Sequence, residues 1–179
     1  MKDAEAVELI RDAVRGAGAT WADLGAGDGI FTRALAELLG PSARIYAVDR
    51  DARSLASLER SARRAGSSVI AVTADFTGPF ELPGLPAHGL DGVLLANALH
   101  YVREPAGVLG RVTARLRPGG RVVLIEYDRR GPNRWVPFPI PMADLSALAA
   151  AAGLTPPVFI ATKPSAFGGD LYVASMERG

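Results

Sequence analysis

The feature that most constrains the fold is a run of glycines within residues 21–31, which read WADLGAGDGIF. Three of the five positions 25–29 are glycine, and they lie between an apolar segment and a helical one. Because glycine has no side chain, the backbone there can turn sharply and approach a ligand closely. Such a turn between a strand and a helix is typical of α/β folds that bind ligands at the carboxyl ends of their strands. The run therefore predicts an α/β fold with a ligand site beside it.

Strand-like and helix-like segments alternate along most of the chain. The strand-like segments are short and apolar, whereas the helix-like ones have apolar residues at helical spacing and end at glycine or proline. The expected strands are 19–25, 43–49, 68–75, 90–96, 121–127, 157–162 and 170–176. The expected helices are 4–16, 30–39, 51–66, 104–116 and 142–153, and residues 76–89 and 128–141 are expected to be irregular.

This order predicts a parallel sheet with helices on both faces, because parallel neighbours need a crossover connection. The last two strands are joined by a short turn, so they can only pair antiparallel, as a hairpin. Residues 1–179 show no internal repeat or linker and are expected to form a single domain. A chain of this length can bury about 70% of the surface that it exposes when unfolded.

Charge and cysteine content exclude several classes of function. The 20 Lys and Arg residues are balanced by 19 Asp and Glu, and they do not form the concentrated basic stripe that nucleic-acid binding requires. With no cysteine and only His88 and His100 as histidines, we expect no disulfide and no metal site. No apolar run reaches the ~18–20 residues of a membrane span, and the N-terminus is not a signal peptide. We therefore expect a cytoplasmic protein that contacts neither nucleic acid nor membrane.

The spacing within the glycine run separates the possible ligands. The dinucleotide fingerprint G-x-G-x-x-G would need glycine where the chain has Ile30, and the P-loop would need a lysine that is not nearby. Instead, Asp23 precedes the run and Asp28 lies inside it. Two carboxylates repel a diphosphate and favour a cationic ligand. A dinucleotide is thus disfavoured by both pattern and charge.

Acidic residues also end the next two expected strands. Asp49 ends the second, where a carboxylate can accept hydrogen bonds from both hydroxyls of a ribose. Asp75 ends the third and is followed by Phe76, a pair that can bond an adenine amino group and cover a ring face. The strand ends thus offer groups for an amino acid, a ribose and an adenine, and none for phosphates.

This combination resembles the class I S-adenosylmethionine-dependent methyltransferases, and the resemblance covers nearly the whole chain. DLGAGDG at 23–29 is similar to their first motif, DGVLLANALHYV at 91–102 to their fourth-strand motif, and LRPGGRVVLIE at 116–126 to their turn into strand five. The resemblance implies a Rossmann-like three-layer α/β sandwich, with a mostly parallel seven-stranded sheet and a C-terminal antiparallel β-hairpin. It also implies S-adenosylmethionine as the methyl donor and S-adenosylhomocysteine as the product.

The resemblance assigns a cofactor site by position. Asp23 and the first glycines would surround the methionine part, Asp49 would bind the ribose, and Asp75 with Phe76 the adenine. The expected cofactor-binding residues are Asp23, Gly25, Ala26, Gly27, Asp49, Arg50, Asp75, Phe76, Asn97 and Ala98.

Catalytic candidates follow the fourth strand. A dedicated base is optional, because positioning alone contributes much of the rate in reactions of this kind. If there is one, His100 is the leading candidate, since histidine titrates near neutrality. Its imidazole could instead cap the following loop or brace the cofactor. Tyr101 is a second candidate, and Glu126 is either a contact to substrate or a satisfied polar neighbour.

Residues 128–141 follow the fifth strand and are expected over the acceptor side of the site. Tyr127, Arg129, Trp135 and Phe138 are the expected substrate contacts. The aromatic residues could form an apolar or cation-binding wall, or pack on the domain or a dimer interface. The arginines at 129, 130 and 134 could meet an anionic substrate or be solvated. The helix at 4–16 is a candidate lid.

Missing motifs narrow the substrate to a small molecule. Asn97 is not followed by the two prolines of family members that methylate adenine or glutamine nitrogen, and two lysines cannot supply the set used on RNA ribose. An acceptor with an O, N, S or C nucleophile is left, with the protein as a monomer or a homodimer. A protein of the same fold that binds the cofactor without catalysis, as a sensor or scaffold, is the alternative.

Overall fold

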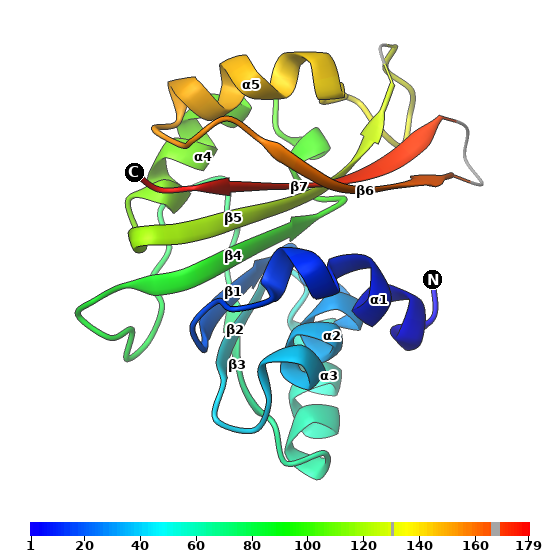
Figure 1. Cartoon of the computed structure of the whole chain (residues 1–179). Helices are drawn as coiled ribbons and strands as arrows, with labels where there is room; N and C mark the ends of the chain where they lie inside the picture. Colours follow the sequence, from blue (N-terminus) through cyan, green and yellow to red (C-terminus); the bar gives the residue numbers. More distant parts are fainter. Residues whose placement is uncertain (130, 166–168) are drawn as a thin grey trace.

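Seven strands form one sheet in the order β3-β2-β1-β4-β5-β7-β6 (Figure 1). The computed structural model describes residues 1–129, 131–165 and 169–179. The strands are β1 (Thr20–Leu24), β2 (Arg44–Asp49), β3 (Ser68–Thr73), β4 (Leu90–Ala96), β5 (Leu116–Asp128), β6 (Val158–Pro164) and β7 (Asp170–Glu177). β1 to β5 pair in parallel, whereas β7 pairs antiparallel with both β5 and β6. The predicted mostly parallel sheet with a C-terminal antiparallel hairpin is confirmed.

Helices cover both faces of the sheet (Figure 1). They are α1 (Asp3–Val14), α2 (Ile30–Leu39), α3 (Ala52–Arg64), α4 (Pro105–Thr113) and α5 (Met142–Ala151), with a short 3-10 helix η1 (Leu99–Tyr101) after β4. Successive strand residues point to opposite faces. Trp21 and Ile45 pack with α1, α2 and α3, and their neighbours Ala22 and Tyr46 pack with α4 and α5. The three-layer sandwich is therefore confirmed.

A glycine and a tryptophan fix the contact between β1 and β4 at the centre of the sheet. Trp21 is fully buried, and its register partner on β4 is Gly92. A Cβ added to Gly92 would lie 2.4 Å from the indole, so only glycine leaves room for the ring. The indole N–H donates to the carbonyl of Gly18 at 2.9 Å. This packing holds together the two strands whose ends meet at the site.

The structure moves some predicted element boundaries. β5 begins at Leu116, whereas the sequence predicted its start at 121. A register shift between Leu90 and Gly92 lets Leu90 pair with Leu116, so the expected turn at 117–120 lies inside the strand as an irregularity. The helix predicted at 104–116 ends earlier, at Thr113. Such an irregularity is set by strand pairing, which the local sequence does not reveal.

The strand order places a crevice at the carboxyl ends of β1 and β4. The chain runs outward from β1 through β2 to β3, and β4 then begins on the other side of β1. At such a reversal the connections leave in opposite directions, and ligands of open α/β sheets bind in the gap. The glycine turn after β1 lies at this point, as predicted.

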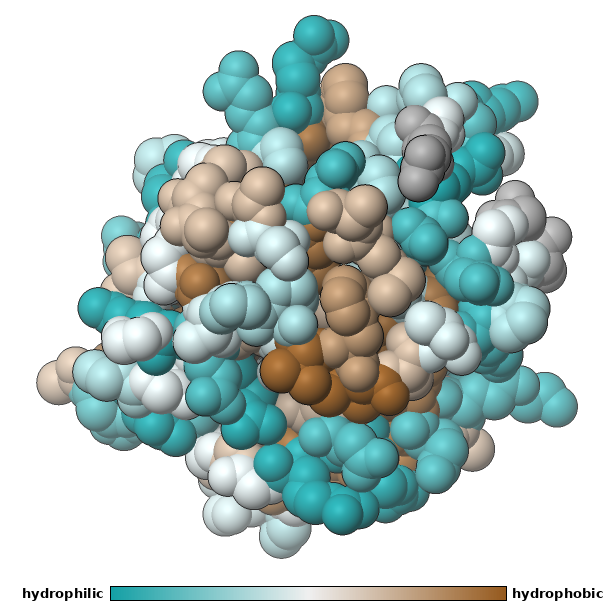
Figure 2. Space-filling model, turned by 45° about the horizontal axis from the view of Figure 1, so that its top comes forward, coloured by the Kyte–Doolittle hydropathy of each residue, from teal (hydrophilic) through white to brown (hydrophobic). Residues whose placement is uncertain are grey.

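The outer edge of the sheet carries exposed apolar side chains. β6 is the last strand, and its Val158 and Phe159 are 61% and 40% exposed. Figure 2, in which the top of the Figure 1 view is brought forward, shows apolar atoms gathered near the middle of the side in view, with polar atoms around them. The alternatives of monomer and homodimer both stay predictions.

Candidate functional site

The glycine turn after β1 is tied to the end of β2. The N–H groups of Gly25 and Ala26 both donate to the carbonyl of Val48, at 2.8 and 3.1 Å. Gly25 has φ +80°, and a Cβ there would lie 2.7 Å from the Cβ of Ala98. Gly27 has φ +50°, and a Cβ there would meet no atom within 4 Å. The turn therefore needs glycine at its close approach to residue 98 and is open to space at position 27.

Asp49 holds this turn in place and also lines the adjacent cavity. Its Oδ2 accepts the N–H of Gly27 and its Oδ1 accepts the N–H of Asp51, both at 2.8 Å. The carboxylate thus joins the turn after β1 to the start of α3. Because a carboxylate oxygen can accept more than one hydrogen bond, Asp49 keeps acceptor capacity for a ligand.

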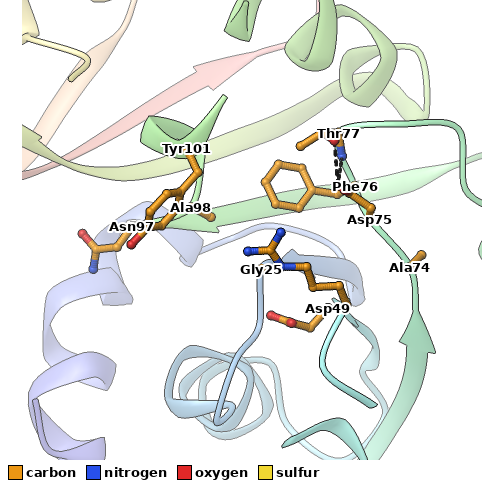
Figure 3. A pocket seen from close by; sticks show the side chains of 10 residues that line it. Gly25, Asp49, Ala74, Asp75, Phe76, Thr77, Asn97, Ala98 and Tyr101 are labelled. Atoms are coloured by element: carbon orange, nitrogen blue, oxygen red, sulfur yellow. Dashed lines mark hydrogen bonds between the residues drawn. The ribbon is translucent and has the colours of Figure 1, made fainter. Parts of the chain in front are cut away.

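A cavity of about 410 Å³ opens between the ends of β1, β2, β3 and β4 (Figure 3). Its lining residues are Gly25, Asp49, Arg50, Ala74, Asp75, Phe76, Thr77, Asn97, Ala98 and Tyr101. Figure 3 shows the Asp49, Phe76 and Tyr101 side chains reaching into this space from three different segments. A Cβ on Gly25 would lie 3.6 Å from the Phe76 ring, so the ring covers the turn. We name this space the strand-end cavity.

Asp75 is fixed at the rim of the strand-end cavity by the residue two positions on. Its Oδ1 accepts both the N–H and the hydroxyl of Thr77, at 2.9 and 2.6 Å. These two hydrogen bonds hold the pKa of the Asp75 carboxyl below its usual value. Asp75 is therefore presented as an ionised acceptor.

Asp23 lies deeper and is almost fully buried, at 1% exposure. Its Oδ2 accepts the hydroxyl of Thr32 at 2.6 Å. Burial raises the pKa of Asp23 to about 6, the Thr32 hydrogen bond opposes this, and the nearby charge of Asp49 adds to it. Asp23 lines a second hollow of about 230 Å³ that also reaches Gly25, Ala26, Asp28 and Asn97. A cation entering that hollow would favour the ionised form of Asp23.

The raised pKa of Asp23 predicts how stability depends on pH. An acid whose folded-state pKa lies above its unfolded value stabilises the fold at low pH, and this contribution is lost as pH rises through the folded pKa. For a rise in the pKa of Asp23 from 3.8 to about 6, the free energy of unfolding lost at high pH amounts in full to about 3 kcal/mol. Asp23→Asn keeps an acceptor for Thr32 but cannot ionise. At pH 4 the unfolded carboxyl is already partly ionised, so in urea unfolding wild type should lose about 2 kcal/mol relative to this variant between pH 4 and pH 7. If the free energies of unfolding of wild type and Asp23→Asn changed equally with pH, the raised pKa of Asp23 would be contradicted.

Asn97 connects the spaces around the site. It has φ +52°, a left-handed conformation that Asn adopts more readily than most residues. Its Oδ1 is buried and, within the described part of the chain, accepts no hydrogen bond. Buried polar atoms are nearly always paired, so an unpaired oxygen here points to a donor from a bound molecule.

A third cavity, of about 390 Å³, lies beyond Asn97 and Tyr101. Its lining residues are Asn97, His100, Tyr101, Tyr127, Arg129, Asn133, Trp135 and Val136. We name this space the aromatic cavity. The strand-end cavity and the aromatic cavity share Asn97 and Tyr101 in their linings. Two chemically different cavities therefore meet at the end of β4.

His100 is held at the wall of the aromatic cavity by Glu126. Both are buried, and His100 Nδ1 lies 2.6 Å from Glu126 Oε2. The other oxygen, Oε1, accepts the N–H of Leu99 and of His100, at 3.0 and 3.1 Å. With a carboxylate at Nδ1, the imidazole proton is held on that nitrogen, which leaves Nε2 as an acceptor. Glu126 therefore sets both the tautomer and the orientation of His100.

The structure gathers most of the predicted residues around the two cavities. Seven predicted cofactor residues line the strand-end cavity: Gly25, Asp49, Arg50, Asp75, Phe76, Asn97 and Ala98. Asp23 and Ala26 line the neighbouring hollow, and Gly27 contacts Asp49 through its backbone. Tyr127, Arg129 and Trp135 line the aromatic cavity with the catalytic candidates His100 and Tyr101. Arg130 lies outside the described residues.

Phe138 does not line either cavity, although it was predicted to contact substrate. Its N–H donates to the carbonyl of His100 at 3.0 Å, and the Arg103 guanidinium lies 5.3 Å from its ring centroid. The residue thus anchors the loop to η1. Sequence reasoning overlooked four residues that line the two cavities, namely Ala74, Thr77, Asn133 and Val136. The Asn-Arg-Trp turn was a local signal that could have indicated Asn133.

Neither a helix that could span a membrane nor a metal-binding cluster is present among the described residues. No helix in this part of the chain is both long and apolar enough to cross a membrane. Over the same residues, no three His, Asp or Glu side chains gather as they would around a metal ion. The expectation of a metal-free site stays a prediction.

This sheet order is that of the class I S-adenosylmethionine-dependent methyltransferases, and the chain belongs to that family. The match to the methyltransferase domain family covers residues 22–122, which is more than half of the chain. A protein relative, the uncharacterized 37.1 kDa protein of transposon Tn4556 from Streptomyces fradiae, is 33% identical over 106 residues. These make up 59% of this chain and 29% of that protein.

Solved structures share the fold over nearly the whole chain. The 1,6-didemethyltoxoflavin-N1-methyltransferase of Burkholderia thailandensis, with 1,6-didemethyltoxoflavin and S-adenosylhomocysteine bound, superposes with a TM-score of 0.76. It is 26% identical, over 98% of this chain and 77% of that one. The CurJ carbon methyltransferase has a TM-score of 0.78 at 19% identity, over 99% of this chain and 54% of that one, which shows the fold alone.

Proposed function

We propose that the chain transfers a methyl group from S-adenosylmethionine to a small-molecule acceptor by in-line displacement. The observation that carries this proposal is the meeting of the strand-end cavity and the aromatic cavity at Asn97 and Tyr101. Direct transfer between two bound molecules requires that their sites adjoin and fix their mutual orientation. A shared wall between two cavities of different chemistry satisfies that requirement.

The residues of the strand-end cavity and its neighbouring hollow fit S-adenosylmethionine. Asp49 offers acceptors to ribose hydroxyls, and Phe76 and Asp75 offer a ring face and an acceptor to adenine. The open space at Gly27, buried Asp23 and the unpaired Oδ1 of Asn97 suit the charged methionine end. We infer that these groups hold the cofactor, and that Arg50 lies beside it.

When bound, S-adenosylmethionine supplies a methyl group on a cationic sulfur, so the acceptor's bond to carbon forms as the S–C bond breaks and its electron pair stays with sulfur. The protein's part is to aim the acceptor and to keep water out. Tyr101 and Asn97 would form the wall past which the two reactants meet. Tyr127, Arg129 and Trp135 would bind the acceptor, and Phe138 would support them by fixing the loop at 128–141.

His100 would act as the general base when the acceptor must lose a proton. It lines the aromatic cavity, and its Nε2 is the ring nitrogen not held by Glu126. The acceptor's proton would pass to Nε2, while Glu126 stabilises the charge that forms on the imidazole. Tyr101, whose ring centroid lies 4.3 Å from that of His100, is the second catalytic candidate.

We infer that residues 1–179 act as one methyltransferase domain, with the loop at 128–141 on the acceptor side. α1 packs on the sheet through Ala6, Val7 and Ile10, and Met1 lines the hollow beside Asp23. Arg33 donates to Asp3 at 2.8 Å and to the carbonyl of Asp28 at 2.9 Å, which joins the start of α1 to the glycine turn. This position supports a role for α1 as a lid over the cofactor.

An acceptor screen tests the function. The protein is incubated with S-adenosylmethionine and a panel of small molecules that carry O, N, S or acidic C–H nucleophiles, and S-adenosylhomocysteine is quantified. We expect turnover with at least one class of acceptor. Cofactor binding without turnover on any of them would favour the alternative of a non-catalytic S-adenosylmethionine-binding protein. Absence of cofactor binding would contradict both.

A further inference from the structure

The aromatic cavity is built mainly from large flat side chains. Tyr101 comes from η1, Tyr127 from the end of β5, and Trp135 from the loop before α5, with Val136 completing the apolar lining. Its volume of about 390 Å³ suits a small organic molecule, not a polymer. Aromatic rings from three segments around one cavity favour a flat aromatic ligand. Stacked or edge-to-face ring pairs stabilise a complex by more than the burial of their apolar surface alone.

Two of these rings are held open to solvent. Tyr101 is 57% and Trp135 is 62% exposed. The backbone at Trp135 is fixed by Asn133, whose Oδ1 accepts the backbone N–H of Trp135 at 2.8 Å and that of Val136 at 2.7 Å. The Asn133 N–H in turn donates to the carbonyl of Val136 at 3.0 Å. A closed turn thus presents an indole that a ligand in the cavity would cover.

The charges at this cavity are basic. Arg129 lines it, and the Arg134 guanidinium lies 4.6 Å from the ring centroid of Trp135. Among the described residues no Asp or Glu lines the cavity. Glu126, behind the wall, is engaged by His100 and two backbone N–H groups, and Asp128 accepts the N–H of Met142. A cationic acceptor would therefore meet no facing carboxylate, whereas an anionic one would meet Arg129.

We propose that the acceptor is a planar aromatic or heteroaromatic acid, with an ionisable O–H or N–H, that carries net negative charge. This inference rests on the proposed methyl transfer. The O–H or N–H proton passes to Nε2 of His100 as the acceptor's lone pair forms the bond to the methyl carbon, and the S–C electron pair stays with sulfur. Arg129 binds the anionic substituent, and the rings of Trp135 and Tyr101 cover the aromatic plane.

Calorimetry with three probes that share one ring system tests the class. The full chain, saturated with S-adenosylhomocysteine, is titrated with 3-hydroxy-2-naphthoate, 2-naphthol and 2-naphthylmethylamine. These are respectively anionic, neutral and cationic at neutral pH. The expected order of affinity is naphthoate, then naphthol, then amine. An amine that binds as tightly as the naphthoate, or a naphthoate that does not bind, overturns the proposal.

Variants at exposed or half-buried positions separate charge from stacking without disturbing the core. Arg129→Gln should weaken the naphthoate about 10-fold and leave the naphthol unchanged, because one charge-assisted contact is lost. Trp135→Ala should weaken both probes about 10-fold through lost ring contact. Arg64→Gln, an exposed arginine on α3, is the matched control and should change neither. If Arg129→Gln lost the same affinity for naphthoate as for naphthol, the proposed contact between Arg129 and the anionic group would be overturned.

The same titrations distinguish this inference from the proposed function. S-adenosylhomocysteine is titrated first, so its binding is known before any probe is added. Cofactor binding with the wrong probe order overturns the acceptor class alone. If S-adenosylhomocysteine does not bind, the proposed function fails, and the probe order on the unliganded chain still decides what the aromatic cavity accepts.

Discussion

Replacing His100 by asparagine is expected to lower kcat for an O–H or N–H acceptor by about 10²–10⁴-fold. The asparagine amide keeps an N–H donor toward Glu126, so the buried carboxylate is not left without a side-chain partner. It supplies no basic nitrogen to the aromatic cavity, so the acceptor's proton has no receiver. The measurement is the rate of S-adenosylhomocysteine formation at saturating concentrations of both substrates.

The affinity for S-adenosylhomocysteine is the control for this variant, because His100 lines the aromatic cavity and not the strand-end cavity. Its Kd should match that of wild type. Unchanged kcat in His100→Asn would mean that His100 only supports the loop through its carbonyl bond to Phe138. In that case positioning alone would account for the rate.

Glu126→Gln tests the positioning role of the residue behind His100. A glutamine that turns its amide N–H toward Nδ1 forces the imidazole proton onto Nε2, which removes the base while His100 stays in place. The kcat for an O–H or N–H acceptor should fall about as far as in His100→Asn, while the Kd for S-adenosylhomocysteine stays that of wild type. A Glu126→Gln variant with the wild-type kcat would show that Glu126 is structural only.

Replacing Asp49 by alanine is expected to weaken S-adenosylhomocysteine binding by about 100-fold, or about 2.7 kcal/mol. The change removes the acceptors proposed for the ribose hydroxyls. It also frees the Gly27 N–H that Asp49 holds at 2.8 Å, so the glycine turn loses one of its links to β2 and keeps the two backbone bonds to Val48. Both effects act on the cofactor and neither on the aromatic cavity. Titration calorimetry with S-adenosylhomocysteine measures the change.

Asp51→Ala is the matched control for Asp49. Asp51 lies two positions on and caps α3, where its Oδ1 accepts the N–H of Arg53 at 2.9 Å. Its loss should reduce the free energy of unfolding, because the start of α3 loses its side-chain cap. The affinity for S-adenosylhomocysteine should not change. Equal losses of affinity in the two variants would assign the effect to the local fold and not to a ligand contact.

The sheet and the cofactor side were predictable because local patterns determine them. The glycines at 25–29 and the strand-end acids Asp49 and Asp75 follow directly from the ends of short apolar segments. In a parallel sheet these ends lie at one edge, so residues far apart in sequence can be brought together by topology alone. The absence of a helix between the last two strands likewise required an antiparallel pair.

The acceptor side was less predictable because long-range pairing and turn geometry determine it. Glu126 meets His100 only because β4 and β5 pair with Ala96 opposite Ile125, which places the next residue of β5 under η1. The sequence analysis named both residues as candidates but did not predict that they contact each other. Phe138 turned to η1 because its backbone bonds to His100, a contact that hydropathy does not encode.

Thermal melting of the full chain with different ligands tests directly whether the glycine turn belongs to a site for S-adenosylmethionine. S-adenosylmethionine, S-adenosylhomocysteine, NAD and ATP are each added at about 100 times a plausible Kd, which for a true ligand stabilises the fold by about 2.7 kcal/mol. For a chain of this size that corresponds to a shift of about 5–10 °C. The predicted result is a shift with the first two ligands only. A shift with NAD alone, or with none of the four, would contradict the assignment of the glycine turn to S-adenosylmethionine.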